Sequence, residues 1–255
     1  MAKPTVAVFA FTGCEGCSLA ILECENELLD IVNLVQFVEW REAMSEKTTE
    51  PIDIALVDGA VSKRSDITHL QHIRQRAKML IAIGSCASNG GLNALKNRYQ
   101  MDEVKRIVYG EPGMHFDTIP ARPLHAVVPV DFEIPGCPMQ SHEFLKILSE
   151  LLAGKQPRLP NYPVCVECKR KENVCVYEKG MICMGPVARA GCGADCPSAG
   201  AWCDACRGFV DNPNENAHWE VLQKYNLTPE EIMQRFNMYC SYELEERKAK
   251  QGQSK

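Results

Sequence analysis

The distribution of cysteine is the feature of this sequence that most restricts its fold. The chain has 255 residues and 14 cysteines, and eight of the cysteines fall between Cys165 and Cys206. A segment this rich in cysteine and glycine, without strong hydrophobic periodicity, buries little apolar area and needs cross-links or metal centres to hold its shape. The sequence therefore predicts a part of the chain that is organised by its thiols.

The first residues bear on whether these thiols form disulfides. An apolar run starts at residue 5, and neither a basic stretch nor a twin arginine precedes it, so we expect no export signal. No window approaches 18 uninterrupted apolar residues, and we expect no membrane span. These features predict a cytoplasmic protein, in which abundant cysteine indicates metal or redox chemistry more often than disulfides.

The overall composition narrows the class of protein further. Hydrophobic residues make up 45% of the chain and charged residues 24%, values that are typical of globular proteins and not of disordered or fibrous ones. The formal net charge is −5, which argues against a nucleic-acid partner. The length suits one or two domains.

Residues 1–157 alternate short apolar strands with amphipathic helices. This alternation predicts an α/β domain in which a parallel sheet carries helices on both faces. The strands are expected at residues 5–11, 34–40, 52–57, 79–83 and 128–134, and helices at residues 19–31, 67–78 and 142–153.

The composition changes after residue 154, where three prolines lie close together and indicate a linker. We expect a second domain at residues 158–255, cysteine-rich and mostly irregular, with a helical tail. The tail helix is predicted to begin at Thr228-Pro229-Glu230, with threonine as the cap, proline at the first helical position and an acidic first turn.

Four cysteines of the first domain follow predicted strands directly. Cys14 and Cys17 come after the first strand, Cys86 after the strand at 79–83, and Cys137 after the last strand. The carboxyl ends of parallel strands share one edge of a sheet, so these four thiols are expected to converge there. Glycines beside them allow the backbone to pass close to a bulky inorganic group. Four cysteines are the ligand inventory of one [4Fe–4S] cluster.

The second domain contains two further groups of four cysteines. They are Cys165, Cys168, Cys175 and Cys183, followed by Cys192, Cys196, Cys203 and Cys206. Each group suffices for a four-thiolate iron–sulfur cluster, although the two Cys-x2-Cys pairs also match the ligand spacing of zinc sites.

Two further observations favour iron–sulfur clusters. Cys137-Pro138 and Cys196-Pro197 contain the Cys-Pro pair that recurs in iron–sulfur proteins. Twelve cysteines also divide into three groups of four, as a relay of three redox centres requires. The remaining Cys24 and Cys240 lie on apolar helical stripes and are expected in the core.

Taken together, these motifs resemble the small subunits of [NiFe] hydrogenases. The resemblance rests on TGCEGCS at residue 12, GSC at 84, IPGCP at 134 and the cysteine run from 165 to 206. It is strongest to the cytosolic subunits typified by the delta subunit of sulfhydrogenase. It implies a flavodoxin-like first domain.

By the same resemblance, each group of cysteines corresponds to one [4Fe–4S] cluster. The proximal cluster corresponds to Cys14, Cys17, Cys86 and Cys137, the medial cluster to Cys192, Cys196, Cys203 and Cys206, and the distal cluster to Cys165, Cys168, Cys175 and Cys183. The exported hydrogenases instead use a histidine at the distal cluster and only three cysteines at the medial one. Replacing cysteine by histidine raises a cluster's potential, so the all-cysteine sets favour a low-potential acceptor.

The resemblance also implies partners. The NiFe centre belongs to an obligate large subunit, and no catalytic residue is expected in this chain. Electrons from H2 would pass through the three clusters to flavin and iron–sulfur subunits of the diaphorase type, which carry FAD or FMN, and on to NAD(P)+ in a reversible reaction. One alternative is a relay that feeds a heterodisulfide reductase or a ferredoxin-linked bifurcating complex. The other alternative is a zinc-stapled scaffold without redox activity.

Overall fold

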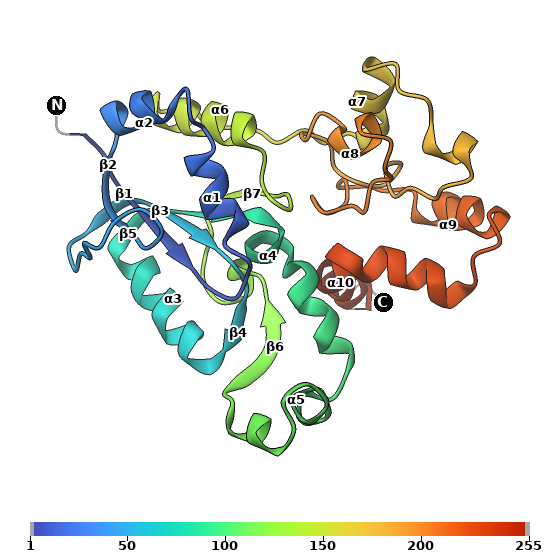
Figure 1. Cartoon of the computed structure of the whole chain (residues 1–255), viewed down its shortest axis with the longest axis horizontal. Helices are drawn as coiled ribbons and strands as arrows, with labels where there is room; N and C mark the ends of the chain where they lie inside the picture. The colour runs from blue at the N-terminus through green and yellow to red at the C-terminus, as the bar shows by residue number, and fades with distance from the viewer. Residues whose placement is uncertain (1–2, 253–255) are drawn as a thin grey trace. The chain divides into compact units, whose positions relative to one another are not determined.

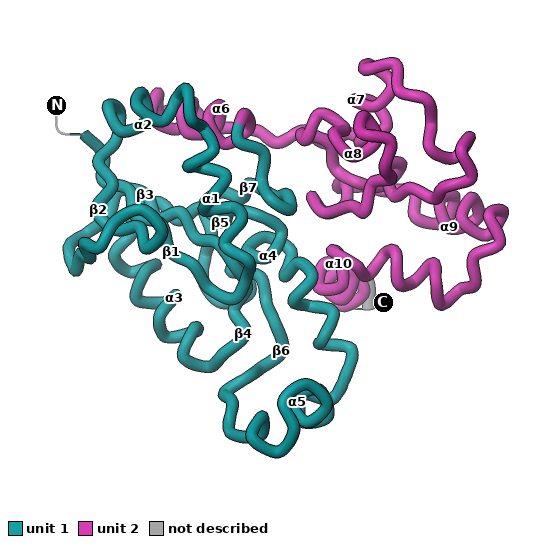
Figure 2. Tube along the Cα trace, viewed as in Figure 1, with its two compact units in different colours: residues 1–141 teal, residues 142–255 magenta. Residues whose placement is uncertain are grey.

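The computed structural model describes residues 3–252. The chain forms two compact units, Met1–Ser141 and His142–Lys255 (Figure 2). The boundary lies earlier than the residue 157 expected from the sequence, because helix α6 (Ser141–Leu152) belongs mostly to the second unit. The assignment of one cluster to the first domain and two to the second stays a prediction.

The first unit is built on a parallel sheet of five strands in the order β2-β1-β3-β5-β7 (Figure 1). Every neighbouring pair is parallel, as the sequence predicted. Most side chains of β1, β3 and β5 are buried, and this burial explains why the sequences of these three strands are nearly continuously apolar. The strands are β1 (Thr5–Ala10), β2 (Gln36–Trp40), β3 (Ile52–Asp58), β5 (Ala77–Ile83) and β7 (Phe132–Ile134).

One predicted helix of this unit is divided in two. The single helix expected at residues 19–31 is two helices, α1 (Gly16–Leu22) and α2 (Leu28–Leu34). A tight turn separates them, in which the Cys24 N–H bonds to the Ile21 carbonyl three residues back. Glutamates occupy positions 23, 25 and 27 of this turn, and their like charges disfavour a continuous helix.

Other elements of the first unit lie between the strands. The helix expected at 67–78 is α3 (Arg64–Arg76). Helices α4 (Gly84–Asn89) and α5 (Met101–Tyr109) and an antiparallel pair, β4 (Val61–Lys63) with β6 (Thr118–Arg122), were not predicted. The last strand, at Phe132–Ile134, is shorter than the predicted 128–134 and follows a 3-10 turn at Leu124–Ala126.

The second unit contains short helices joined by long irregular segments. They are α6, α7 (Val164–Arg170), a 3-10 turn at Val176–Lys179, α8 (Asp195–Ser198), α9 (Glu215–Lys224) and α10 (Pro229–Gly252). The cap of α10 is as predicted, because the Thr228 hydroxyl accepts the Glu231 N–H and the Glu231 carboxylate accepts the Thr228 N–H.

The cysteine-rich segment of this unit has a hydrophobic core, so the expectation that it buries little apolar area is wrong. Val176, Val187 and Phe209 of the segment are buried in one cluster with Leu222 of α9 and Phe236 of α10. The tail helices α9 and α10 therefore complete a hydrophobic core to which the cysteine-rich segment also contributes.

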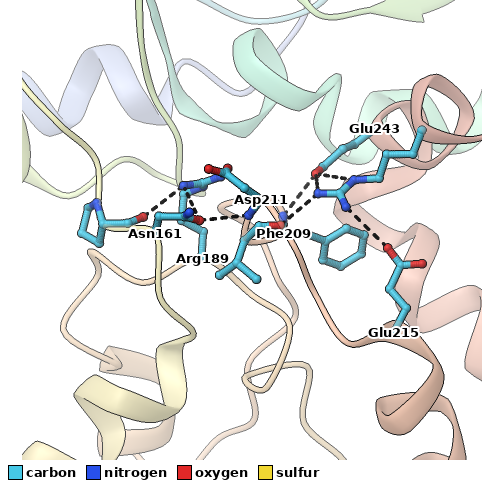
Figure 3. A network of polar contacts seen from close by, with 9 residues as sticks. Asn161, Arg189, Phe209, Asp211, Glu215 and Glu243 are labelled. Carbon is cyan, nitrogen blue, oxygen red and sulfur yellow. Dashed lines mark hydrogen bonds and ion pairs between the residues drawn. The ribbon is translucent and has the colours of Figure 1, made fainter. Parts of the chain in front are cut away.

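A network of polar contacts also ties the end of the cysteine-rich segment to its surroundings (Figure 3). Arg189 donates to the carboxylate of Asp211 at 2.6 Å. On α10, Glu243 accepts the backbone N–H of Phe209 at 3.2 Å and is paired with Arg247 at 2.7 Å. The loop that follows the last cysteines is thereby fixed on both sides.

No helix within residues 3–252 combines the length and the apolar character that crossing a bilayer requires. The cytoplasmic location expected from the sequence stays a prediction.

Candidate functional site

Four of the five cysteines of the first unit, hereafter the Cys14 set, follow the carboxyl ends of three parallel strands. Cys14 and Cys17 follow β1, and Cys17 is in the first turn of α1. Cys86 lies in α4, which starts where β5 ends, and Cys137 follows β7. The sheet order places β1 and β5 on either side of β3, so the topology brings these loops to one edge.

The electrostatics of the Cys14 set show that its members are close together. The pKa of Cys86 is raised to about 12, mainly by burial and in part by the nearby Asp58, Cys137 and Cys14. Burial also raises the pKa of Cys17, with contributions from Asp58, Cys137 and Cys86. The Cys17 and Cys86 thiols therefore resist ionisation when bare, although Cys14 and Cys137 are exposed. Metal ligation requires thiolates and stabilises them, so this donor set fits a cationic inorganic core.

Two glycines are packed against cysteines of this set. Gly84 has φ +82°, and a Cβ there would lie 2.2 Å from the Cys17 Sγ. Gly91 has φ +53°, and its Cβ would lie 3.0 Å from the Cys86 Sγ. Both positions need the left-handed backbone that glycine adopts readily. The role expected for Gly84 from the sequence fits this geometry, whereas Gly91 was not singled out.

Sequence reasoning missed two polar residues of this site. Asp58, the last residue of β3, is buried and accepts the backbone N–H of Gly59 at 2.7 Å. Burial is the main cause that raises the pKa of this carboxyl. The Asn93 side chain donates its N–H to the Cys86 Sγ at 3.4 Å and to the Thr12 carbonyl at 3.0 Å. The position of Asp58 at a strand end beside β1 was the available signal.

The first group of the second unit, the Cys165 set, is also brought together. Cys165 and Cys168 lie one turn apart on α7, and Cys175 and Cys183 flank the following 3-10 turn. The pKa of Cys165 is raised to about 11, mainly by burial and in part by the other three thiols of the set. A Cβ at Gly185 would lie 3.3 Å from the Sγ atoms of both Cys165 and Cys183, so the backbone passes close to this set.

The second group, the Cys192 set, lies next to the Cys165 set. Burial raises the pKa of Cys203, with Cys183, Cys206 and Cys192 adding to the shift, and Cys192 acts on Cys196 in the same way. The backbone N–H of Cys203 donates to the Cys183 Sγ at 3.3 Å. The two sets of this unit are therefore in direct contact through the peptide backbone.

The two remaining cysteines are in the core, as expected. Cys24 is 3% exposed and its thiol donates to the Ala20 carbonyl, while Cys240 is fully buried with its thiol directed at the Ala205 carbonyl. Both thiols thus donate to backbone carbonyls, and that of Cys240 reaches one 35 residues away.

A site for a single metal ion requires closer spacing of its ligands than a [4Fe–4S] cluster does. Within the described part of the chain, no three Cys, His, Asp or Glu side chains are spaced to bind one metal ion. Each thiolate of a [4Fe–4S] cluster binds a different iron atom, so that spacing does not apply to the cluster. Four thiolates per set is the donor inventory such a cluster requires.

Comparison with known proteins places these sites in a family. Residues 14–151 match the family model described as NADH ubiquinone oxidoreductase, 20 Kd subunit. The delta subunit of sulfhydrogenase 2 from Pyrococcus furiosus is 38% identical over 93% of this chain and 99% of its own length. A second relative, from the vhu F420-non-reducing hydrogenase of Methanocaldococcus jannaschii, is 33% identical over 81% of this chain and 82% of that protein.

A solved structure agrees with these relatives. A chain of an NAD+-reducing [NiFe]-hydrogenase, in the H2-reduced state, superimposes with a TM-score of 0.57 and 29% identity, covering 62% of this chain and 96% of that chain. The fold, the cysteine sets and the matched length agree with the resemblance found in the motifs. The chain belongs to the family of NiFe hydrogenase small subunits that includes the sulfhydrogenase delta subunits.

Proposed function

We propose that this chain is the electron-transfer subunit of a hydrogenase and holds three [4Fe–4S] clusters, one in each cysteine set. The observation that supports the proposal is that cysteines within each predicted set act on one another electrostatically. When bound, the clusters supply one-electron carriers between an H2-splitting NiFe centre and a redox acceptor. The chain itself fixes the positions of the thiolates and donates hydrogen bonds to several of their sulfurs.

The resemblance to hydrogenase small subunits implies an order of relay. We assign the Cys14 set to the proximal cluster, the Cys192 set to the medial one and the Cys165 set to the distal one. The contact between the Cys203 N–H and the Cys183 Sγ supports direct transfer between the medial and distal positions. The glycines beside the Cys14 set leave its loops without bulky side chains near the sulfurs, which suits the close approach of a neighbouring subunit.

The proposed partners follow from the family. The NiFe centre is assigned to an obligate large subunit, because the twelve grouped cysteines are all used by the clusters and the other two are in the core. One similar solved structure is named as NAD+-reducing. That name supports NAD(P)+ as the final acceptor, reached through flavin and iron–sulfur subunits of the diaphorase type.

The first test is the metal content of the complex purified without oxygen. We expect a brown protein with about twelve iron and twelve acid-labile sulfide per chain, as three cubane clusters require, and a nickel-containing large subunit that co-purifies. A colourless chain with bound zinc and no sulfide would instead establish the scaffold alternative.

A variant tests the role of the Cys14 set. Cys17→Ala is expected to reduce the iron content and to abolish H2-dependent reduction of the physiological acceptor. Cys24→Ala is the matched control, because Cys24 lies in the core seven residues further along the chain, and it should retain both iron and activity. Normal acceptor reduction by Cys17→Ala would refute the assigned relay.

A further inference from the structure

A buried ion pair lies beside the Cys192 set. Two guanidinium nitrogens of Arg207 donate to the two carboxylate oxygens of Glu143 at 2.7 and 2.8 Å, and the side chains are 2% and 8% exposed. The Arg207 Nε also donates to the Ala190 carbonyl at 2.9 Å. The guanidinium is therefore held in one orientation. Apolar residues of similar volume often replace such buried pairs at no cost in stability, so stability alone does not account for it.

The pair contacts the backbone at both ends of the Cys192 set. Arg207 directly follows Cys206, and Gly191 directly precedes Cys192. A Cβ at Gly191 would lie 2.3 Å from the Arg207 Nη2 and 2.6 Å from the Glu143 Oε1. Residue 191 has φ +119° and no space for a side chain, which means that the backbone of this loop is pressed against the ion pair.

Two side chains of opposite charge meet at Gly191, the residue before Cys192. One is the Arg207 guanidinium, against which the Cβ position of Gly191 is packed. The other is Glu167, which lies between the two α7 cysteines of the Cys165 set. Its Oε1 accepts the Gly191 N–H at 2.9 Å, and its buried Oε2 has no hydrogen-bond partner within the described chain.

We propose that Arg207, held in place by Glu143, is a positioning residue that raises the reduction potential of the cluster bound by the Cys192 set. Reduction adds negative charge, and a nearby buried cation stabilises the reduced form because little solvent screens it. Net charge and hydrogen bonding around a cluster are known determinants of its potential. This inference rests on the proposed function, since it requires a cluster at this set.

The test is a redox titration of the whole complex, purified without oxygen and followed by electron paramagnetic resonance of the clusters. Arg207→Met is expected to shift the midpoint potential of this cluster to lower values. Glu143→Gln leaves the cation uncompensated and is expected to shift it to higher values. Arg207→Lys keeps the charge and should restore most of the wild-type potential. Opposite shifts from the two members of one ion pair are not expected from a merely structural contact.

Two further variants complete the design. Arg189→Met removes the same charge from an ion pair in the same unit, but Asp211, its partner, is 69% exposed, so solvent screens it and no shift is expected. If the single variants fail to fold, the double variant Arg207→Met/Glu143→Leu replaces the pair by apolar groups. It should still lower the potential, because Arg207 directly follows the ligand Cys206 and its Nη2 lies nearer than the Glu143 Oε1 to the Cβ position of Gly191, at 2.3 against 2.6 Å.

The outcomes separate the two proposals. A wild-type complex with no iron–sulfur signal from this set would refute the proposed function. A normal wild-type signal that Arg207→Met and Glu143→Gln leave unchanged, or shift in the same direction, would refute the role of Arg207 alone.

Discussion

At the scale of single residues, Asn93 connects two loops of the Cys14 set through its side-chain amide. Its N–H donates to the Cys86 Sγ at 3.4 Å, and hydrogen bonds to ligand sulfurs stabilise the more negative, reduced state of a cluster. We expect Asn93→Ala to lower the midpoint potential of the cluster at this set, measured by redox titration.

Asn97 provides the control for this prediction. It lies four residues along the chain and exchanges two 2.7 Å hydrogen bonds with the backbone of Ala121. Asn97→Ala should cost about 1–3 kcal/mol of stability and leave the potential of the cluster unchanged. Equal shifts in the two variants would show that the effect of Asn93 is structural.

His218 predicts a pH dependence of stability in the second unit. It is 3% exposed, neither ring nitrogen has a hydrogen-bond partner within the described chain, and burial lowers its pKa to about 4. The unfolded chain binds a proton near the ordinary pKa of 6.5, whereas the folded chain does not. The free energy of unfolding therefore has its full value above pH 6.5. It decreases by up to about 3 kcal/mol as the pH falls from 6.5 towards 4.

Denaturant unfolding at several pH values measures this loss. His218→Phe should remove much of the pH dependence between 6.5 and 4, because Phe cannot be protonated. A variant at an exposed histidine, His72→Phe, should retain it. An identical pH profile for His218→Phe and the wild type would contradict the prediction.

Spacing along the chain explains which residues of the sites were predictable. The cysteines could be grouped because their local patterns and strand-end positions are visible in the sequence. Arg207 and Glu143 could not, because they are 64 residues apart and only the fold joins them. The same holds for Asn93, whose partner Thr12 is 81 residues away.

At the scale of elements, long apolar runs predicted the five parallel strands, and caps predicted the start of α10. The pair β4 and β6 escaped prediction because β4 has only three residues, two of them polar. The break between α1 and α2 escaped because apolar residues continue with helical spacing on both sides of it. Short elements and turns depend on partners that periodicity does not reveal.

The start of α4 gives a prediction at this scale. Gly84 is its first residue, and any Cβ there would collide with the Cys17 Sγ. We expect Gly84→Ala to displace this sulfur and to reduce the iron bound by the Cys14 set, measured by iron analysis and spectroscopy of that cluster. Gly154→Ala is the control, because Gly154 also has a positive φ, of +70°, but nothing within 4 Å of its Cβ position. It should cost about 1 kcal/mol and no iron.

At the scale of the whole molecule, the two units differ in what holds them together. The first unit has a core of sheet residues that includes Ala55, Val57, Leu80 and Ala82. In the second unit, long irregular segments separate short helices, and their shape is fixed by a smaller core, polar contacts and the thiol sets. The sequence predicted an irregular, cysteine-rich second domain but placed its boundary at residue 157, because α6 reads as one more helix of the alternating pattern.

This contrast predicts how the chain responds when iron is removed. Chelation under reducing conditions leaves the thiols of the Cys165 and Cys192 sets crowded and without a cation, and metal binding is coupled to folding in such segments. We expect hydrogen exchange to accelerate across residues 164–209, while β1, β3 and β5 stay protected by their ladder and core. Since Leu222 and Phe236 share the core of that segment, α9 and α10 should lose part of their protection as well. Uniform acceleration across both units would contradict the prediction, because it would mean that the sheet also depends on the clusters.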